Sequence, residues 1–443
     1  MKKFLLILII AIVFASCSNY ESGELVGVAR KGSYFEPTPY GMILVPMGSY
    51  VMGPNDEDIS KSLNAKSKTI SVEAFWMDET EITNNEYRQF VYYVRDSIIR
   101  RKLGEIQEDF LITEDDNGNP IDPPIINWET EIDYENEEIR EALKELYLSK
   151  EERFYGRNEF DSRLLNYEYF WIDIKQASNP KNRYNFNTKK YEGEVTNLEG
   201  NKVPINDRSA FIMRDVINVY PDTLCWAADF AYSFNEPMVT MYFWHPAYDN
   251  YPVVGVNWRQ ARAFAIWRSQ YLNNYLASRG EPFVHDYRLP FEAEWEYAAR
   301  GNLALMKYPW GGPYTRNYLG CFLANFKPLR GNYIDDGAFY TIKVASYEPN
   351  DYGLYDMAGN VAEWTADSFD ESAYSFEHDM NPYNTYEARP DDPPALKRKV
   401  VRGGSWKDVG YFIQVGTRTY EYQDTATSFI GFRCVRTYLG NSD

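Results

Sequence analysis

The stretch from Gly353 to Asp367, GLYDMAGNVAEWTAD, is the feature that most constrains the fold of this 443-residue chain. Two acidic side chains, Asp356 and Glu363, stand seven positions apart around Gly359. The pattern is too irregular for an amphipathic helix and too rich in glycine for a central strand. A carboxylate pair in such a turn fits three kinds of structure: a catalytic dyad, a metal site or a solvated loop. From Asn302 on, the chain is predicted to be mostly loop, rich in Gly, Tyr, Trp and Asn, whereas its C-terminal end is predicted to form strands.

Regular elements are predicted mainly from helix caps. Thr83 followed by Glu86 is a capping-box pattern, and the apolar residues after it fall on one helical face. Asn257 can cap a second helix with a broad apolar stripe, and a third helix is expected within residues 290–301. Apolar alternation suggests a hairpin over residues 41–54.

Residues from about 97 to 250 differ in composition from the rest and are predicted to be an insertion. Residues 105–159 are dominated by Asp and Glu, and residues 185–206 indicate polar hairpins. The insertion has large aromatic residues to bury: Trp128, Tyr134, Trp171 and Trp226. Two interpretations stay open, a solvated excursion and a partner-binding surface, and the retained aromatics favour the second.

The N-terminus is predicted to be a targeting segment. Two lysines precede an 11-residue apolar run, which is shorter than the roughly 20 residues that span a bilayer. The end of this run, FASC, resembles the lipobox of bacterial lipoproteins. We therefore expect a signal peptide over residues 1–16, lipidation at Cys17 and a lipidated tether over residues 17–40; an ordinary signal peptide is the alternative.

Net charge excludes some partners. The formal charge is −19 and the isoelectric point is about 4.8. This charge argues against nucleic acid and against electrostatic docking to anionic lipid, whereas it permits cation binding or a basic protein partner. The other cysteines are Cys225, Cys321 and Cys434, so at most one internal disulfide can form. Whether Cys225 and Cys321 pair stays open.

Several motifs occur in a fixed order: VNWRQARAFAIWR, YRLPFEAEWEYAARG, YPWGG, GLYDMAGNVAEW, VVRGGSW and GFRC. Together with PMGSYVMG and DETEITNNEYRQF, they resemble the formylglycine-generating-enzyme, or sulfatase-modifying-factor, domain. The resemblance covers about residues 41–96 and 251–437. It implies an α+β fold of the C-type-lectin-like kind, loop-rich with little regular secondary structure. The domain would span residues 41–437 and be interrupted by the insertion at about 97–250.

The resemblance also implies structural Ca²⁺. Calcium takes mixed carboxylate and carbonyl oxygens, which one curled segment can supply. A hydrogen-bonded turn without an ion is the alternative at both sites. The first implied ligand set is Asp356, Gly359, Val361 and Glu363, and the second is Asn325, Phe326, Asp336 and Ala338.

The resemblance does not extend to catalysis. The oxidase holds copper through two cysteines just after the Gly-Ser-aromatic motif, and thiolates are the ligands that Cu(I) selects. Here the motif ends at Trp406, and neither Asp408 nor its neighbours supply a thiol. The histidines, His245, His285 and His378, lack the spacing of an iron site. We therefore expect a non-catalytic domain, a pseudoenzyme without copper or iron.

Within the superfamily, the lipobox and the N-terminal motifs most resemble GldK/PorK-type lipoproteins of the type IX secretion and gliding motility machinery. This resemblance implies a lipid-anchored protein on the periplasmic side of the outer membrane. It also implies self-association in a ring with a GldN/PorN-type periplasmic partner. The alternatives are an envelope glycan- or peptidoglycan-binding lipoprotein on a lectin-like scaffold, and an enzyme of unknown chemistry.

Overall fold

The computed structural model describes residues 35–54, 66–115, 117–153, 156, 158–229, 231–232 and 235–440. Residues 38–439 form one compact unit. The predicted signal peptide, the lipidation residue Cys17 and most of the predicted tether lie outside the described residues. Within the described part of the chain, no helix is long and apolar enough to cross a bilayer.

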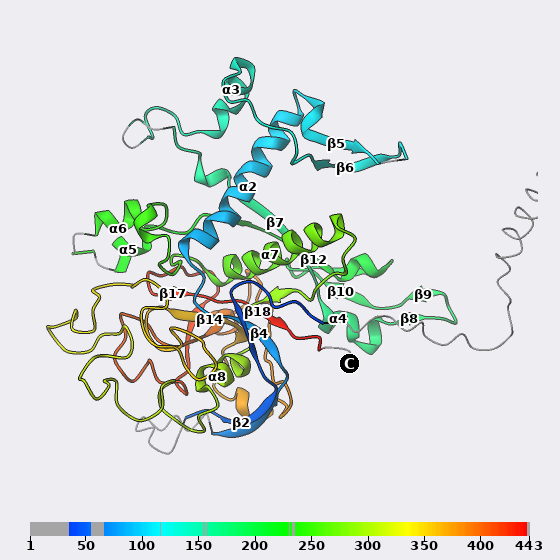
Figure 1. Ribbon diagram of the computed structural model, residues 1–443. Helices are drawn as coiled ribbons and strands as arrows, with labels where there is room; N and C mark the ends of the chain where they lie inside the picture. The colour runs from blue at the N-terminus through cyan, green and yellow to red at the C-terminus, as the bar shows by residue number, and fades with distance from the viewer. Residues whose placement is uncertain are drawn as a thin grey trace, which may run out of the picture. The chain divides into compact units, whose positions relative to one another are not determined.

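One four-stranded antiparallel sheet joins the two ends of this unit (Figure 1). Its strand order is β1 (Met42–Val45), β4 (Phe75–Asp78), β18 (Val435–Thr437) and β13 (Tyr287–Arg288). The predicted hairpin over residues 41–54 is wrong, because β2 (Gly48–Met52) pairs with β3 (Lys68–Val72) instead of β1. Pro46 directly follows β1 and has no N–H for a ladder, and both strands find apolar partners farther along the chain.

A second four-stranded sheet contains the second half of the Gly353–Asp367 stretch. Its strand order is β16 (Thr419–Tyr422), β15 (Arg398–Arg402), β14 (Ala362–Ser368) and β17 (Ile430–Gly431). The expectation that Gly353–Asp367 contains no central strand is therefore wrong for its second half. Ala362 and Trp364 are buried in the main hydrophobic core, and this burial outweighs the glycine-rich flank.

Three capped helices pack against these sheets. Helix α2 (Asn84–Gly104) begins with the predicted Thr83–Glu86 capping box, and α7 (Trp258–Ser278) begins at the predicted cap, Asn257. Helix α8 (Glu292–Arg300) ends at Gly301, whose φ of 55° is left-handed. Tyr87 of α2 stacks on Phe264 of α7 with ring centroids 5.6 Å apart. The helix predictions are confirmed.

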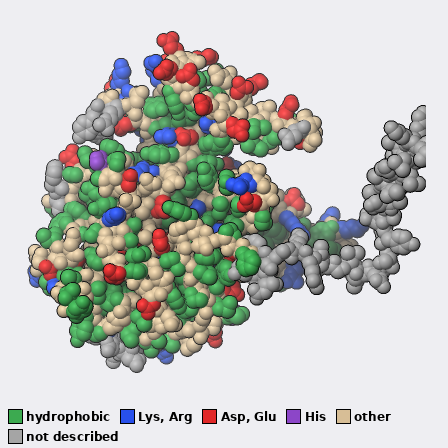
Figure 2. All heavy atoms as spheres, viewed as in Figure 1, with side chains coloured by type: hydrophobic (Ala, Val, Ile, Leu, Met, Phe, Trp, Pro, Cys, Tyr) green, Lys and Arg blue, Asp and Glu red, His purple; other side chains and the backbone are tan. Residues whose placement is uncertain are grey.

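The insertion divides into three parts (Figure 1). The first, here the acidic lobe, comprises residues 105–161. Its β5 (Leu111–Glu114), β6 (Pro120–Ile126) and α3 (Glu137–Leu143) surround the C-terminal half of α2. Ile99 and Leu103 of α2 bury there with Phe110, Ile139 and Leu143. The insertion is therefore packed on the domain, and Figure 2 shows many Asp and Glu side chains on this lobe.

The second part of the insertion consists of small hairpins. Strands β7 (Asn166–Ile172) and β12 (Ile212–Asn218) pair with each other and pack on α7. Between them lie the polar hairpins β8 (Tyr184–Asn185) with β9 (Lys190–Tyr191), and β10 (Glu194–Thr196) with β11 (Lys202–Pro204). These confirm the hairpin prediction for residues 185–206.

The third part of the insertion, residues 219–250, packs on Trp406, the last residue of the Gly-Ser-aromatic motif. Trp226 stacks on Trp406 with ring centroids 6.0 Å apart. The remaining helices are α4 (Ile174–Ser178), α5 (Cys225–Asp229), α6 (Glu236–Met241) and α9 (Ala373–Phe376), and the 3₁₀ turns are Glu108–Phe110, Lys144–Leu146, Ser162–Leu164, Pro180–Asn182, Arg208–Phe211, Pro246–Tyr248 and Pro394–Lys397.

Candidate functional site

The Gly353–Asp367 stretch forms a tight turn held by backbone contacts to distant segments. Asp356 and Asn360 adopt left-handed φ values of 56° and 58°. At Gly359 a Cβ would lie 2.2 Å from the carbonyl oxygen of Asn325, so only glycine fits there. The Asn360 N–H donates to that same Asn325 carbonyl at 2.8 Å. This hydrogen bond brings the two predicted calcium-ligand sets next to each other.

In the first set, Glu363 is occupied by other partners. Arg433 donates to both of its carboxylate oxygens at 2.7–2.9 Å, and the Trp295 indole N–H donates to Oε2 at 2.7 Å. The side chains of Glu363 and Arg433 are both completely buried. The carboxylate therefore serves as an ion-pair acceptor here, and a cation would have to displace Arg433 to reach it. This arrangement does not fit calcium at the first set.

Glu81 lies beside this turn and was not predicted as a site residue. It is fully buried and accepts hydrogen bonds from the Val361 N–H at 2.9 Å and from Asn360 Nδ2 at 2.6 Å. Burial raises the pKa of Glu81 well above its ordinary value, and the nearby carboxylates of Asp356 and Glu363 raise it further. Glu81 belongs to the DETEITNNEYRQF motif, but nothing in its sequence neighbourhood indicates a contact with residue 361.

Asp356 is the remaining carboxylate of the first set. Its Oδ2 accepts the Ala345 N–H at 2.7 Å, and burial raises its pKa to about 6. Among the described residues, no group of three or more His, Cys, Asp or Glu side chains is arranged to hold a metal ion. The turn is therefore held by its own hydrogen bonds around Asp356 and by the Glu363–Arg433 ion pair.

The second ligand set fits a cation better. Asp336 is buried; its Oδ2 accepts the Phe326 N–H at 2.7 Å, whereas its buried Oδ1 accepts no hydrogen bond from the described residues. Burial raises the pKa of Asp336, and the amides of Phe326 and Ala338 oppose that shift. Asn325 Nδ2 donates to the Tyr340 carbonyl at 2.9 Å. An unpartnered buried carboxylate oxygen is the donor that a hard cation takes.

The segment after the Gly-Ser-aromatic motif is closed by its own contacts. Asp408 Oδ2 accepts from the Ser405 N–H at 3.0 Å and from Ser405 Oγ at 2.6 Å. Ile413 is completely buried and packs against Tyr308, Phe326 and the alanines at 324 and 358. The described cysteines lie elsewhere: Cys225 and Cys434 are buried, Cys321 is exposed, and all three are free. Cys225 and Cys321 therefore do not form a disulfide.

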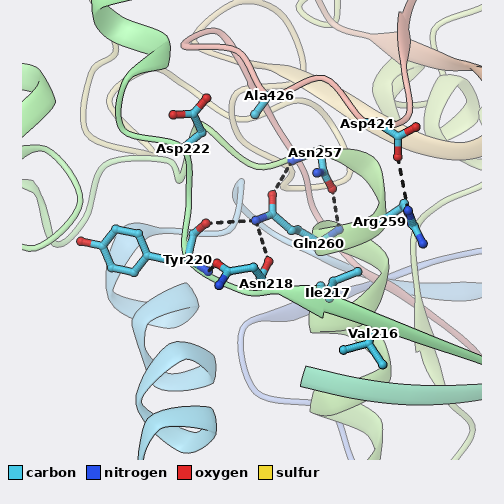
Figure 3. A pocket seen from close by; sticks show the side chains of 10 residues that line it. All are labelled: Val216, Ile217, Asn218, Tyr220, Asp222, Asn257, Arg259, Gln260, Asp424 and Ala426. Carbon is cyan, nitrogen blue, oxygen red and sulfur yellow. Dashed lines mark hydrogen bonds and ion pairs between the residues drawn. The ribbon is translucent and has the colours of Figure 1, made fainter. Parts of the chain in front are cut away.

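A polar pocket of about 380 Å³ lies where the insertion meets α7 (Figure 3). Its amides bond to the protein itself: Gln260 donates to the carbonyls of Asn218 and Tyr220 at 3.0 and 3.1 Å. Arg259 forms an ion pair with Asp424 at 3.5 Å across the opening. The pocket thus offers a polar rim with few unsatisfied groups.

Comparison with protein families places the fold. The model of the sulfatase-modifying factor enzyme 1-like domain matches residues 32–141 and 145–438. The chain belongs to this family. The match includes the insertion as well as the motif-bearing segments, and the predicted loop-rich fold with mixed helices and strands is confirmed.

Relatives within the family include named enzymes and inactive proteins. The chain is 34% identical over 190 residues to the inactive C-alpha-formylglycine-generating enzyme 2 of Bos taurus, covering 42% of this chain and 50% of that protein. It is also 34% identical over 189 residues to the formylglycine-generating enzyme of Streptomyces coelicolor, covering 42% and 52%. The matches thus span about half the length of these relatives. A solved structure, PvdO from Pseudomonas aeruginosa, aligns over 93% of this chain and 100% of its own, with 16% identity and a TM-score of 0.44.

Proposed function

We propose that this family member is a non-catalytic structural lipoprotein, a ring subunit of the periplasmic and outer-membrane core of a type IX secretion and gliding motility apparatus. The observation that carries the non-catalytic part is the closed segment after Trp406. Cysteine oxidation through copper needs thiolates there, and the segment instead holds Asp408 on Ser405 and buries Ile413. A domain without that chemistry can still serve as a folded structural subunit of an assembly.

The assembly part of the proposal rests on the insertion. Residues 105–161 contain 19 Asp and Glu and five Lys and Arg, a net charge of −14 within a chain of −19. Such a surface suits a basic face on a GldN/PorN-type periplasmic ring protein, and charge complementarity accelerates association. Self-association would close a ring if the rotation between copies allows. The lipid anchor at Cys17 would confine the subunits to the outer membrane, on its periplasmic side.

Calcium is part of the same proposal. The unpartnered Oδ1 of Asp336 supports an ion at the second set, with the Asn325 side chain and the carbonyls of Phe326 and Ala338 as further donors. An ion that binds only the folded chain stabilises the loop-rich frame by mass action. At the first set the Glu363–Arg433 pair favours a turn held without an ion.

The deciding experiment is the mass and shape of the native complex. Outer membranes would be extracted in mild detergent and separated by size, and the fractions that contain this protein would be imaged. Megadalton rings with one co-purifying periplasmic protein are expected. Discrete monomers or dimers would overturn the ring assignment.

The polar pocket in Figure 3 favours a second candidate function, envelope glycan or peptidoglycan binding. Its rim carries the carboxylates Asp222 and Asp424 beside Tyr220 and Arg259, groups that can contact sugar hydroxyls and rings. Thermal protection by a glycan, lost in Asp222→Ala, would support this function. A melting temperature that is unchanged across a glycan panel would exclude it.

A further inference from the structure

One segment of this acidic protein is strongly basic. Residues Ile174–Tyr191, here the basic segment, contain five Lys and Arg and no Asp or Glu. All five cationic side chains are exposed, and none forms an ion pair with another described residue. Figure 2 shows blue side chains gathered on the projecting hairpins that hold this segment. The cations are Lys175, Lys181, Arg183, Lys189 and Lys190.

The tip of this segment presents an aromatic ring to solvent. Phe186 lies in the loop between β8 and β9 and is 84% exposed. Tyr184 contacts the ring of Phe186 edge-on at 5.3 Å and the ring of Tyr191 at 5.1 Å. A second large apolar side chain of the segment, Ile174, is 73% exposed. Exposed rings and aliphatic groups therefore alternate with the cations.

The loop that carries Phe186 is held in place by internal hydrogen bonds. Asn185 Oδ1 accepts from the N–H groups of Asn187 and Thr188 at 2.9 and 3.3 Å. Glu192 Oε1 accepts from Asn185 Nδ2 and from Thr188 Oγ1, both at 2.9 Å. The Glu192 carboxylate is thus used to hold the loop, and the exposed ring is presented by a pre-organised turn.

We propose that the basic segment docks on anionic phospholipid headgroups, with Phe186 inserted at the membrane interface. Cations near an anionic leaflet are attracted to it, and aromatic rings favour the headgroup region. A bilayer accepts a protruding ring flanked by flexible cations, whereas a protein partner must enclose that ring in a pocket. The same leaflet repels the acidic lobe, so docking orients the body with that lobe away from the membrane. The net charge of the chain predicts that anionic lipid is avoided. In this proposal, only the acidic lobe is repelled by the lipid.

The inference rests on the membrane localisation proposed above, but its test does not require the ring. All six hydrophobic clusters lie within residues 38–439, so a chain that starts at Ser18 keeps the whole folded unit and lacks the apolar leader. This chain would be floated with vesicles of phosphatidylcholine, or of phosphatidylcholine with phosphatidylglycerol, at low and high NaCl. We expect binding only with phosphatidylglycerol, and its loss at high salt.

Variants can show whether vesicle binding depends on the basic segment or only on the net charge of the protein. Lys189→Glu/Lys190→Glu should weaken binding by at least about 25-fold, since each cation contributes about fivefold near an anionic surface. The matched control, Lys144→Glu/Lys150→Glu, makes the same charge change on exposed residues of the acidic lobe and should change binding much less. Phe186→Ser should weaken binding about tenfold. Phe283→Ser, at another exposed phenylalanine, should not.

Three results would overturn the proposal. One is equal binding to neutral vesicles, and another is equal effects of the two double-lysine variants. The third is a basic-segment variant that binds vesicles normally but loses association with a second copy or a protein partner. Unchanged circular dichroism and melting temperature confirm that the variants fold. Because the assay uses one purified chain, absent rings would test the proposed assembly separately.

Discussion

Glu363 and Arg433 form a completely buried ion pair, with Arg433 Nη2 2.7 Å from Glu363 Oε1 and Nε 2.8 Å from Oε2. The pair joins the GLYDMAGNVAEW and GFRC motifs, which are 70 residues apart between these two side chains. Arg433 Nη1 also donates to the Asp78 carbonyl at 3.0 Å. Because Asp78 ends β4 of the first sheet and Glu363 lies in β14 of the second, the guanidinium joins the two sheets. In the Gly353–Asp367 stretch, the Glu363 carboxylate therefore has a structural role as the acceptor of a buried ion pair.

Breaking this pair is predicted to destabilise the fold strongly. Arg433→Ala leaves a buried, uncompensated carboxylate, which should lower the free energy of unfolding by about 3–5 kcal/mol in urea titration. The control is the exposed pair between Arg214 and Glu168, where Arg214→Ala should cost less than about 1 kcal/mol. Equal costs at both positions would show that burial does not govern the pair.

Calcium removal is predicted to lower the melting temperature. The ion at the second set would satisfy Asp336 Oδ1, so chelator should destabilise the wild type and have little effect on Asp336→Asn. Asp335→Asn, at the neighbouring carboxylate that pairs with Arg316, should keep the sensitivity to chelator. The measurement is a thermal melt with and without chelator. At the first set, Glu363→Ala should keep chelator sensitivity, because that carboxylate holds Arg433 and the Trp295 indole. If chelator leaves the melting temperature of the wild type unchanged, calcium is not part of the proposed function.

Stability is predicted to fall as pH rises through mildly acidic values. Burial raises the pKa of Asp367 to about 6, well above the ordinary value of an unfolded aspartate, about 3.9. Between these values the folded state binds more protons than the unfolded state, so the free energy of unfolding decreases with rising pH, by up to about 3 kcal/mol.

The test of this pH dependence is a series of urea titrations from pH 4 to pH 6. Asp367→Asn should flatten the dependence of the free energy of unfolding on pH over this window. The two Asp367 oxygens accept from the backbone amides of Glu292 and Asn384, and the variant loses one of these two contacts. Asp391→Asn, at an exposed carboxylate, should leave the slope unchanged. A wild-type slope that is flat or rising would contradict the burial argument.

Cysteine oxidation is predicted to be absent. With Cu(I) and a cysteine-containing sulfatase peptide, the purified chain should form no aldehyde by mass spectrometry, because the segment after Trp406 offers no thiolate. The formylglycine-generating enzyme of Streptomyces coelicolor would serve as the positive control. Detectable aldehyde, or copper retained through dialysis, would refute the non-catalytic assignment.

Local features were predictable because their determinants are neighbours in the chain. The Thr83–Glu86 capping box and the Asn257 cap each need hydrogen bonds over three residues. The polar hairpins of residues 185–206 likewise follow from turn residues inside the segment. The hairpin over residues 41–54 failed for the opposite reason, since the partners of β1 and β2 lie elsewhere in the chain.

The candidate site was predictable only in part. The ordered motifs predicted the turn and implied two ligand sets, which stay predictions, and the structure keeps Asn325 next to Asn360. Glu81 was missed because its partner, Val361, is 280 positions away. The ion pair between Glu363 and Arg433 was missed because the two residues are 70 positions apart and the resemblance implied a calcium ligand at Glu363.

The sequence alone determined the family, the helix caps and the absence of cysteine from residues 407–419, directly after Trp406, because these depend on residue identity and short spacing. The tertiary structure decided which carboxylates are free and which are paired, since that depends on the distant segments that meet in the core. It also decided that Phe186 faces solvent between lysines that form no ion pair with a described residue, a property that net charge conceals. Burial and ion pairing are properties of three-dimensional neighbours, and no local pattern in this chain specifies them.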